Sequence, residues 1–313
     1  MSGERCMENA ITVNNLTKRY EGFTLDHVSF QIPTGSIVGF VGENGAGKST
    51  TILAILGIIP ADEGEVELLG HKIREKKNPS EAVDISQDES WREQIGVVFD
   101  ECNFSTELNV KYIPEIMKNI YRTWDNERFV KYLKKFELPV NKKVKELSKG
   151  MKMKLSLAVA LSHDSRLLIL DEATSGLDPV IRNEILDIFR EFIEDGEHTI
   201  FLSSHITSDI EKIADYVMLI HKGRLLFTEN KDELLYRYGI VKCSRKQADF
   251  IPQELIVGEE ENEFGVSVLI NDRTRLMESS FPRQAEKVGY SSFALDRAGV
   301  EDVLLYAVKS AEK

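Results

Sequence analysis

A glycine-rich segment between a strand pattern and a helix pattern places the strongest constraint on the fold of this 313-residue chain. Residues 42–50 read Gly-Glu-Asn-Gly-Ala-Gly-Lys-Ser-Thr, after the apolar run Ile37–Val41 and before the helical pattern Thr50–Leu56. This is the phosphate-loop pattern, in which glycines let the backbone curl until several N–H groups face one anion. A helix that starts near Ser49 also aims its positive end at that anion. The sequence therefore predicts a nucleoside triphosphate site rather than an ordinary glycine-rich turn.

Two side chains of this segment suit particular parts of a nucleotide. Lys48 brings a positive charge to the β and γ phosphates, and Ser49 offers a hydroxyl to Mg²⁺. The residues of the segment that we expect to bind the nucleotide are Gly42, Asn44, Gly45, Ala46, Gly47, Lys48, Ser49 and Thr50.

Short apolar runs alternate with helical patterns around this segment. Four runs rich in Ile, Val and Leu are typical of strands buried on both faces of a parallel sheet: Ile37–Val41, Ile95–Phe99, Leu167–Leu170 and Thr199–Leu202. Helical patterns separate them, at Arg128–Phe136, Lys149–Leu161 and Ile181–Ile193. Val28–Ile32 alternates instead, as a strand with one solvent-facing side does. The sequence therefore predicts an α/β domain with crossover connections.

Two segments depart from this alternation. Residues from about 102 to 163 form a long helical insertion, and the pattern changes again after Tyr238. There, Phe264–Asn271 alternates like a strand, and apolar residues from Val300 to Ala307 recur at helical spacing. We therefore expect a first domain over residues 1–238 and a small α+β extension over residues 239–313.

An acidic pair follows the third buried run. Asp171 and Glu172 stand at its C-terminal end, the edge at which open parallel sheets bind ligands. Asp171 would hold Mg²⁺ through water, and Glu172 would polarise the attacking water as general base. The alternative is that the pair only caps the next helix, but its place downstream of a phosphate loop favours the catalytic interpretation.

The order of further motifs is similar to that of one family. Leu147-Ser148-Lys149-Gly150-Met151 precedes the helical pattern, and Ser175-Gly176-Leu177-Asp178 and then His205 follow the acidic pair. By this order residues 10–235 resemble the ATP-binding subunits of ABC transporters. The resemblance implies a phosphate-loop NTPase fold of the ABC ATPase type, with an antiparallel β subdomain, a helical insertion and the C-terminal extension.

The resemblance also implies a mechanism. Two subunits face head to tail and sandwich two ATP molecules, so that Ser148 and Gly150 of one subunit reach the γ-phosphate bound by the other. Asp178 belongs to the loop that accompanies this site, His205 senses the γ-phosphate, and Tyr20 stacks on adenine. The expected partners are a separate transmembrane permease and a second ABC ATPase, in a homodimer or a heterodimer, at the cytoplasmic face of the membrane. The other five histidines are interpreted as surface or packing residues.

Three positions depart from the family pattern. Asp100 stands where a glutamine is usual; it could bind Mg²⁺ through water but cannot donate a hydrogen bond. Lys149 and Met151 replace the second glycine and the glutamine of the usual signature, although Ser148 and Gly150 remain. This version of the motifs resembles an exporter branch from Gram-positive bacteria.

Composition supports this interpretation and excludes others. The net charge of −12 argues against a non-specific nucleic-acid binder, so no nucleic-acid partner is expected. The lysine-rich stretch Arg128–Lys154 is interpreted as a solvated face, with a docking surface for membrane lipid or for the partner's cytoplasmic helix, or a nucleic-acid surface, as alternatives. It therefore leaves open a second function, a soluble ABC-type ATPase that acts on ribosomes or DNA. Three cysteines, Cys6, Cys102 and Cys243, form no disulfide or zinc pattern. We expect a soluble chain, because no run is long enough to span a bilayer and Met1–Asn9 lacks a signal-peptide pattern.

Overall fold

The computed structural model describes residues 9–73, 90–263, 265–288 and 292–311. Cys6 lies outside these ranges, as do residues 1–8 of the segment Met1–Asn9 in which the sequence shows no signal-peptide pattern. The chain divides into two compact units. The first runs to Ile206 and includes Ile220–Leu225; the second consists of Thr207–Leu219 and the residues from Leu226 onward.

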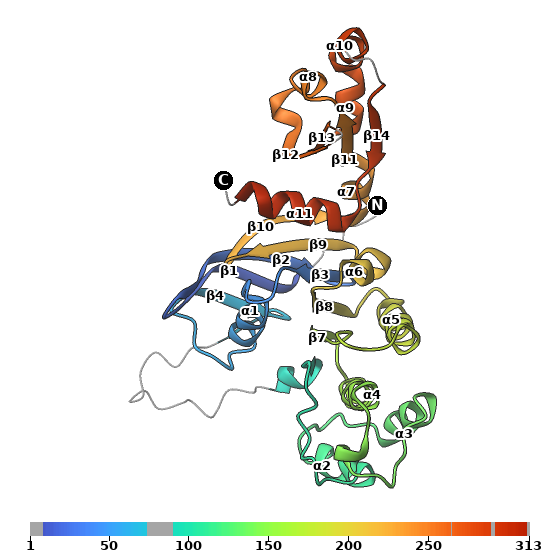
Figure 1. Cartoon of the computed structure of the whole chain (residues 1–313). Helices are drawn as coiled ribbons and strands as arrows, with labels where there is room; N and C mark the ends of the chain where they lie inside the picture. Colours follow the sequence, from blue (N-terminus) through green and yellow to red (C-terminus); the bar gives the residue numbers. More distant parts are fainter. Residues whose placement is uncertain (1–8, 74–89, 264, 289–291, 312–313) are drawn as a thin grey trace, which may run out of the picture. The chain divides into compact units, whose positions relative to one another are not determined.

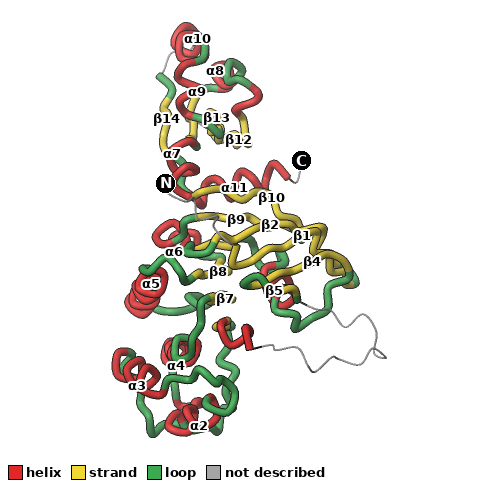
Figure 2. Tube along the Cα trace, turned by 180° about the vertical axis from the view of Figure 1, so that it is seen from behind, coloured by secondary structure: helices red, strands yellow, loops and turns green. Residues whose placement is uncertain are grey.

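The predicted buried runs form the central sheet of the first unit. Neighbouring strands follow the order β3-β8-β7-β6 and pair in parallel; they are β3 (Ile37–Val41), β8 (Thr199–Ser204), β7 (Leu167–Asp171) and β6 (Ile95–Val98). Every residue of β3, β7 and β8 is buried, as continuous apolar strands require. Helix α1 (Lys48–Ile55) and helix α5 (Pro179–Ile193) cover opposite faces of this sheet (Figures 1 and 2). The predicted α/β fold is confirmed.

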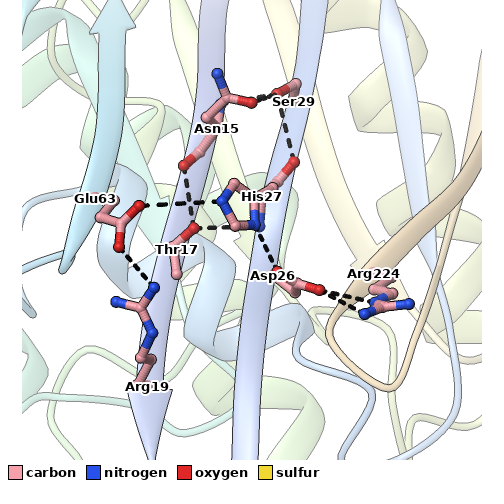
Figure 3. Close-up of polar contacts among 8 residues, drawn as sticks. All are labelled: Asn15, Thr17, Arg19, Asp26, His27, Ser29, Glu63 and Arg224. Carbon is pink, nitrogen blue, oxygen red and sulfur yellow. Dashed lines mark hydrogen bonds and ion pairs between the residues drawn. The ribbon is translucent and has the colours of Figure 1, made fainter.

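An antiparallel sheet forms the second layer of this unit. Its strand order is β2-β1-β4-β5, with β1 (Asn9–Tyr20), β2 (Phe23–Pro33), β4 (Glu63–Leu68) and β5 (His71–Lys72). Ion pairs and hydrogen bonds cross its surface (Figure 3): Arg19 pairs with Glu63 at 2.6 Å, and Asp26 accepts from Arg224 at 2.8 Å. Hydrogen bonds from His27 and Arg224 lower the pKa of Asp26. The predicted antiparallel subdomain is therefore present.

A hairpin turn connects this sheet to the glycine-rich segment. Strands β9 (Tyr216–His221) and β10 (Arg224–Asn230) flank Gly223, whose N–H donates to Ala46 O at 2.9 Å. Gly223 O accepts from the N–H of Asp26 at 2.8 Å. Gly223 has φ +78°, and a Cβ here would lie 1.9 Å from the carbonyl oxygen of Thr24. Only glycine fits this contact, because it combines a left-handed conformation with an absent side chain.

Helices and short 3₁₀ turns fill the segment between β6 and β7. It contains η2 (Val110–Tyr112), α2 (Ile113–Met117), α3 (Asn126–Lys135), η3 (Val144–Glu146) and α4 (Lys149–Ala160), while η1 (Ser90–Gln94) precedes β6. His163 lies at the end of this segment and is 1% exposed. Its ring stacks on that of Tyr121 with 4.0 Å between the ring centroids, and its Nδ1 forms a hydrogen bond with Glu93 O at 2.7 Å. Burial lowers the pKa of His163. Its interpretation as a packing residue agrees with this burial.

The second unit carries its own antiparallel sheet, of strand order β12-β13-β11-β14. Its strands are β11 (Gly239–Cys243), β12 (Ile256–Asn262), β13 (Gly265–Ile270) and β14 (Ala294–Arg297). Its helices are α6 (Thr207–Ile213), α7 (Lys231–Arg237), α8 (Arg245–Ala248), α9 (Arg273–Glu278), α10 (Phe281–Val288) and α11 (Val300–Ala311), with the turn η4 (Gln253–Leu255). Val241, Val268 and Phe281 belong to its apolar core. The strand and helix that the pattern predicts near residues 264–271 and 300–307 are β13 and α11.

Candidate functional site

The parallel strands bring their C-terminal loops to one cavity of about 700 Å³. The loops after β3, β6, β7 and β8 all contribute, because parallel strands end at the same edge of a sheet. The cavity is lined by Gly22, Phe23, Asn44, Gly45, Gly47, Lys48, Ser49, Thr50, Asp100, Glu172, Ser175 and His205. Most of the residues that the sequence singles out therefore meet in one place.

The glycine-rich segment curls as the sequence predicts. Gly47 has φ +112° and lies at the N-cap of α1, where a Cβ would come within 2.9 Å of the Phe23 ring. Helix α1 starts at Lys48, one residue before the predicted start, and has no acidic residue in its first turn. The first turn of α1 therefore presents N–H groups and the positive end of the helix without a carboxylate of its own, as an anion site requires.

Lys48 holds its ammonium ion among oxygen atoms. The side chain is 6% exposed, and Nζ donates to Gly42 O at 2.7 Å and to Glu43 O at 3.2 Å. Nζ also pairs with Glu172 Oε1 at 3.3 Å. A buried ammonium ion needs such partners, because burial removes its hydration.

Glu172 connects three parts of the site. Its second oxygen, Oε2, accepts from Nδ1 of His205 at 2.6 Å, while Oε1 faces Lys48. Its backbone has φ +54°, an uncommon conformation for a non-glycine residue that is frequent at functional sites. The Glu172 N–H donates to Ser203 O at 3.0 Å, which fixes the backbone of Glu172 just after β7. The arrangement suits a base that acts on a water molecule in the cavity.

The oxygen atoms near the cavity suit a hard cation. Ser49 is exposed at the start of α1, Asp100 lines the cavity, and Asp171 accepts from Ser203 Oγ at 2.9 Å. Hydroxyl and carboxylate oxygens are ligands that Mg²⁺ takes, usually with phosphates and water completing its shell. Within the described ranges, no group of three or more His, Cys, Asp or Glu side chains could hold a metal alone. The donor set fits Mg²⁺ that arrives with a nucleotide.

Several predicted site residues lie outside the lining of this cavity. Tyr20 ends β1 and is 47% exposed, with Lys18 Nζ 5.5 Å from its ring centre. Ser148 caps α4 by accepting from the N–H of Met151, and Asp178 caps α5 by accepting from two N–H groups. Gly150 is buried against Ile181. Within one chain, Ser148 and Asp178 thus fill capping roles.

Two lining residues, Gly22 and Phe23, were missed by the sequence analysis, and Ser175 was named there in a motif without a role in the cavity. Phe23 and Gly22 follow β1, and Phe23 supports Gly47 through its ring. Ser175 lies one turn after Glu172 and donates its N–H to Glu172 O at 3.0 Å. The place of Ser175 close after the acidic pair could have predicted its role, whereas no local pattern reveals that Phe23 packs on the phosphate loop.

No helix within the described part of the chain has the length and apolar character needed to cross a membrane.

Comparisons with known proteins agree with this geometry. The family model of the ABC transporter matches residues 25–175, which run from β2 past Glu172. A bacitracin transport ATP-binding protein of Bacillus licheniformis is 35% identical over 247 residues, which cover 78% of this chain and 75% of that protein. A Nod factor export ATP-binding protein of Rhizobium etli is 32% identical over 240 residues, 75% of this chain and 72% of the relative. A solved structure of the ATP-binding subunit of an ABC transporter is 26% identical, covers 72% of this chain and 91% of that chain, and has a TM-score of 0.62.

Proposed function

Because this chain belongs to the ABC transporter family, as one of its ATP-binding subunits, we propose that ATP hydrolysis in the cavity beside Lys48 drives export through a separate membrane subunit. The observation that carries this proposal is the position of Glu172. Its carboxylate lies between the ammonium ion of Lys48 and the imidazole of His205, at the mouth of the phosphate loop. This is where a γ-phosphate and its attacking water would meet.

The phosphate loop binds the triphosphate through its backbone and Lys48. Backbone N–H groups of the loop and of the first turn of α1 would face the phosphate oxygens. Lys48 then exchanges its contact with Glu172 for the phosphates, which frees one carboxylate oxygen of Glu172. Tyr20, exposed at the end of β1, is proposed to stack on adenine.

Glu172 acts as general base for hydrolysis. With Lys48 drawn to the phosphates, Glu172 accepts a hydrogen bond from the attacking water, and His205 holds the other carboxylate oxygen in place. Ser49, Asp171 and Asp100 are proposed to hold Mg²⁺ directly or through water. When bound, Mg²⁺ would neutralise charge on the phosphates. His205 is 44% exposed on its side chain and can also reach the γ-phosphate as its sensor.

A second ATPase completes each site across a head-to-tail dimer. Ser148 and Gly150 at the start of α4 would donate hydrogen bonds to the γ-phosphate held by the partner, and Asp178 would support the same interface. Their place outside the lining of this chain's own cavity supports that assignment. The partner is either a second copy of this chain or a related ATPase.

Export is inferred from the relatives. Two of them are named for bacitracin transport and Nod factor export, and both are ATP-binding proteins. We propose that this chain works at the cytoplasmic face of a membrane, bound to a permease that selects the cargo. Residues 1–238 would form the ATPase domain, with the helical subdomain at about 102–163, and residues 239–313 a C-terminal extension.

The Glu172→Gln variant tests this function with two readouts. The amide keeps the shape of the side chain but cannot take the proton, so phosphate release should fall about 10²- to 10⁴-fold, the usual contribution of a general base. ATP binding should persist and trap a dimer that static light scattering detects. An exposed-site control, Glu115→Gln, should keep wild-type turnover, because Glu115 lies on α2 outside the lining of the cavity. Wild-type phosphate release in Glu172→Gln, or a monomer at saturating ATP, would contradict the proposal.

A further inference from the structure

Two residues that depart from the family pattern are in contact. Asp100 replaces the usual glutamine after β6, and Lys149 replaces the usual glycine at the start of α4, 49 residues later. Lys149 Nζ lies 2.9 Å from Asp100 Oδ1, and both side chains are 49% exposed. A glutamine and a glycine carry no charges, so neither could form this ion pair. Lys149 thus gives Asp100 a charged partner that the usual glycine could not provide.

Asp100 lies where two cavities meet. It lines the nucleotide cavity together with Lys48, Ser49 and Glu172. It also lines a second cavity of about 420 Å³, in which Lys149 and other residues of α4 take part. The ion pair therefore connects the wall of the nucleotide cavity to the first residue of α4.

Lys149 has a second contact with the same region. A Cβ on Gly176 would lie 3.2 Å from Lys149 Nζ, so the ammonium ion rests over the loop that follows Glu172. Ser175, the residue before Gly176, lines the nucleotide cavity. Two walls of the cavity, the loop after β6 and the loop after β7, therefore converge on the Lys149 side chain.

We propose that the Asp100–Lys149 ion pair is a positioning contact that reports the state of the nucleotide cavity to the N-terminal turn of α4. A nucleotide and its cation entering the cavity compete with Lys149 for the Asp100 carboxylate. Because the pair is half exposed, it is weak enough to exchange during each cycle. The affected turn carries Ser148, so this inference rests on the proposed function and adds the residues that set the position of Ser148.

A double-mutant cycle tests the contact. The variants are Asp100→Asn, Lys149→Gln and the two combined, with Lys149→Arg as the conservative replacement. Each single variant should lower kcat about two- to fivefold, as expected for a half-exposed ion pair, with little change in KM for ATP. The double variant should be no slower than the slower single variant, because both remove the same interaction. Lys149→Arg should retain most of the wild-type kcat.

A second readout does not depend on hydrolysis. Hydrogen exchange of the peptide that spans residues 148–154 should change when ATP and Mg²⁺ are added to the wild-type chain, and each single variant should reduce that change. The matched control is the Lys135–Glu191 pair, which has a 2.7 Å contact and similar exposure and also joins the insertion to the core. Lys135→Gln and Glu191→Gln should leave kcat and the exchange response as in the wild type.

Other outcomes separate this inference from the proposed function. If Lys149→Gln keeps the wild-type kcat and exchange response, or if the two single effects multiply in the double variant, the ion pair has no positioning role. Asp100 would then act on the cation alone. If the wild-type chain binds ATP without hydrolysing it, the proposed function fails. Hydrogen exchange in the wild type and the single variants would still decide the role of the ion pair.

Discussion

Lys48 shows how one residue can remain charged inside the fold and still be available to a ligand. Two backbone carbonyls, of Gly42 and Glu43, and the carboxylate of Glu172 surround its ammonium ion. The two carbonyls belong to the phosphate loop itself, so they can stay in place when phosphate oxygens arrive. Only the contact with Glu172 must be given up, and that release also frees the base for its water.

Removing this charge should weaken ATP binding directly. Lys48→Ala deletes a charge-assisted hydrogen bond to phosphate, which corresponds to a loss in affinity of about 10- to 150-fold. Equilibrium titration with a fluorescent ATP analogue measures the change. Lys111→Ala removes an exposed lysine of the insertion that does not line the nucleotide cavity and should keep the wild-type affinity. Equal affinities for Lys48→Ala and the wild type would show that the nucleotide binds elsewhere.

Among the elements, the turn between β9 and β10 has a structural role in the site that its own sequence does not reveal. Gly223 joins Ala46 of the phosphate loop to Asp26 of β2 by two backbone hydrogen bonds. These two bonds tie the phosphate loop to the antiparallel sheet. Arg224, the next residue, adds the contact with Asp26 that Figure 3 shows.

Gly223→Ala should destabilise the fold and loosen the phosphate loop. The new Cβ would meet the Thr24 carbonyl at 1.9 Å, and the strain of a left-handed alanine together with overpacking corresponds to about 2–4 kcal/mol in the free energy of unfolding. Gly70→Ala is the matched control, since Gly70 has a similar φ of +80° with nothing within 4 Å. Urea unfolding curves compare the two variants. Equal midpoints for the two variants would mean that the close contact at Gly223 does not affect the free energy of unfolding.

The helical insertion should become less stable in mild acid because of His163. Burial lowers the pKa of His163 below its ordinary value of 6.5, so the unfolded chain binds this proton more readily than the folded chain. The contribution of neutral His163 to the free energy of unfolding is complete above pH 6.5 and is lost as the pH falls below that value. His163→Phe keeps a ring to stack on Tyr121, and its unfolding free energy should depend less on pH between about 5 and 6.5 than that of the wild type.

Unfolding free energies at several pH values across that window provide the measurement. The control Tyr121→Phe keeps His163 and the ring on which it stacks, and it removes no group that titrates between pH 5 and 6.5, so it should keep the wild-type slope. The same slope in His163→Phe would contradict a neutral, buried His163.

Local patterns predicted the parts of the structure in which neighbouring residues decide the outcome. Ile37–Val41 and Leu167–Leu170 are continuous apolar runs, and burial on both faces follows directly from them. The phosphate loop and Glu172 were found because their residue types stand at fixed places after such strands. The contacts of Phe23 with Gly47 and of Lys149 with Asp100 join segments far apart in the chain. No spacing along one segment encodes these contacts, so they required the fold.

At the level of the whole molecule, charge is unevenly distributed between the insertion and the rest of the chain. Residues 102–163 contain 13 Lys and Arg against six Asp and Glu, whereas the other residues contain 27 against 46. The acidic remainder disfavours the alternative of an ATPase that acts on ribosomes or DNA, since non-specific nucleic-acid binding depends on broad positive charge. The proposed function instead places the output of ATP hydrolysis in a membrane partner.

The most direct test of this account is to purify the full chain from membranes of its native cells in mild detergent and to identify by mass spectrometry what remains bound. The account predicts that a protein with several membrane spans co-purifies in stoichiometric amount. It also predicts that the nucleotide added changes how much of this protein stays bound. Ribosomal or DNA-repair proteins in the soluble fraction, without any membrane partner, would contradict the assignment to an exporter.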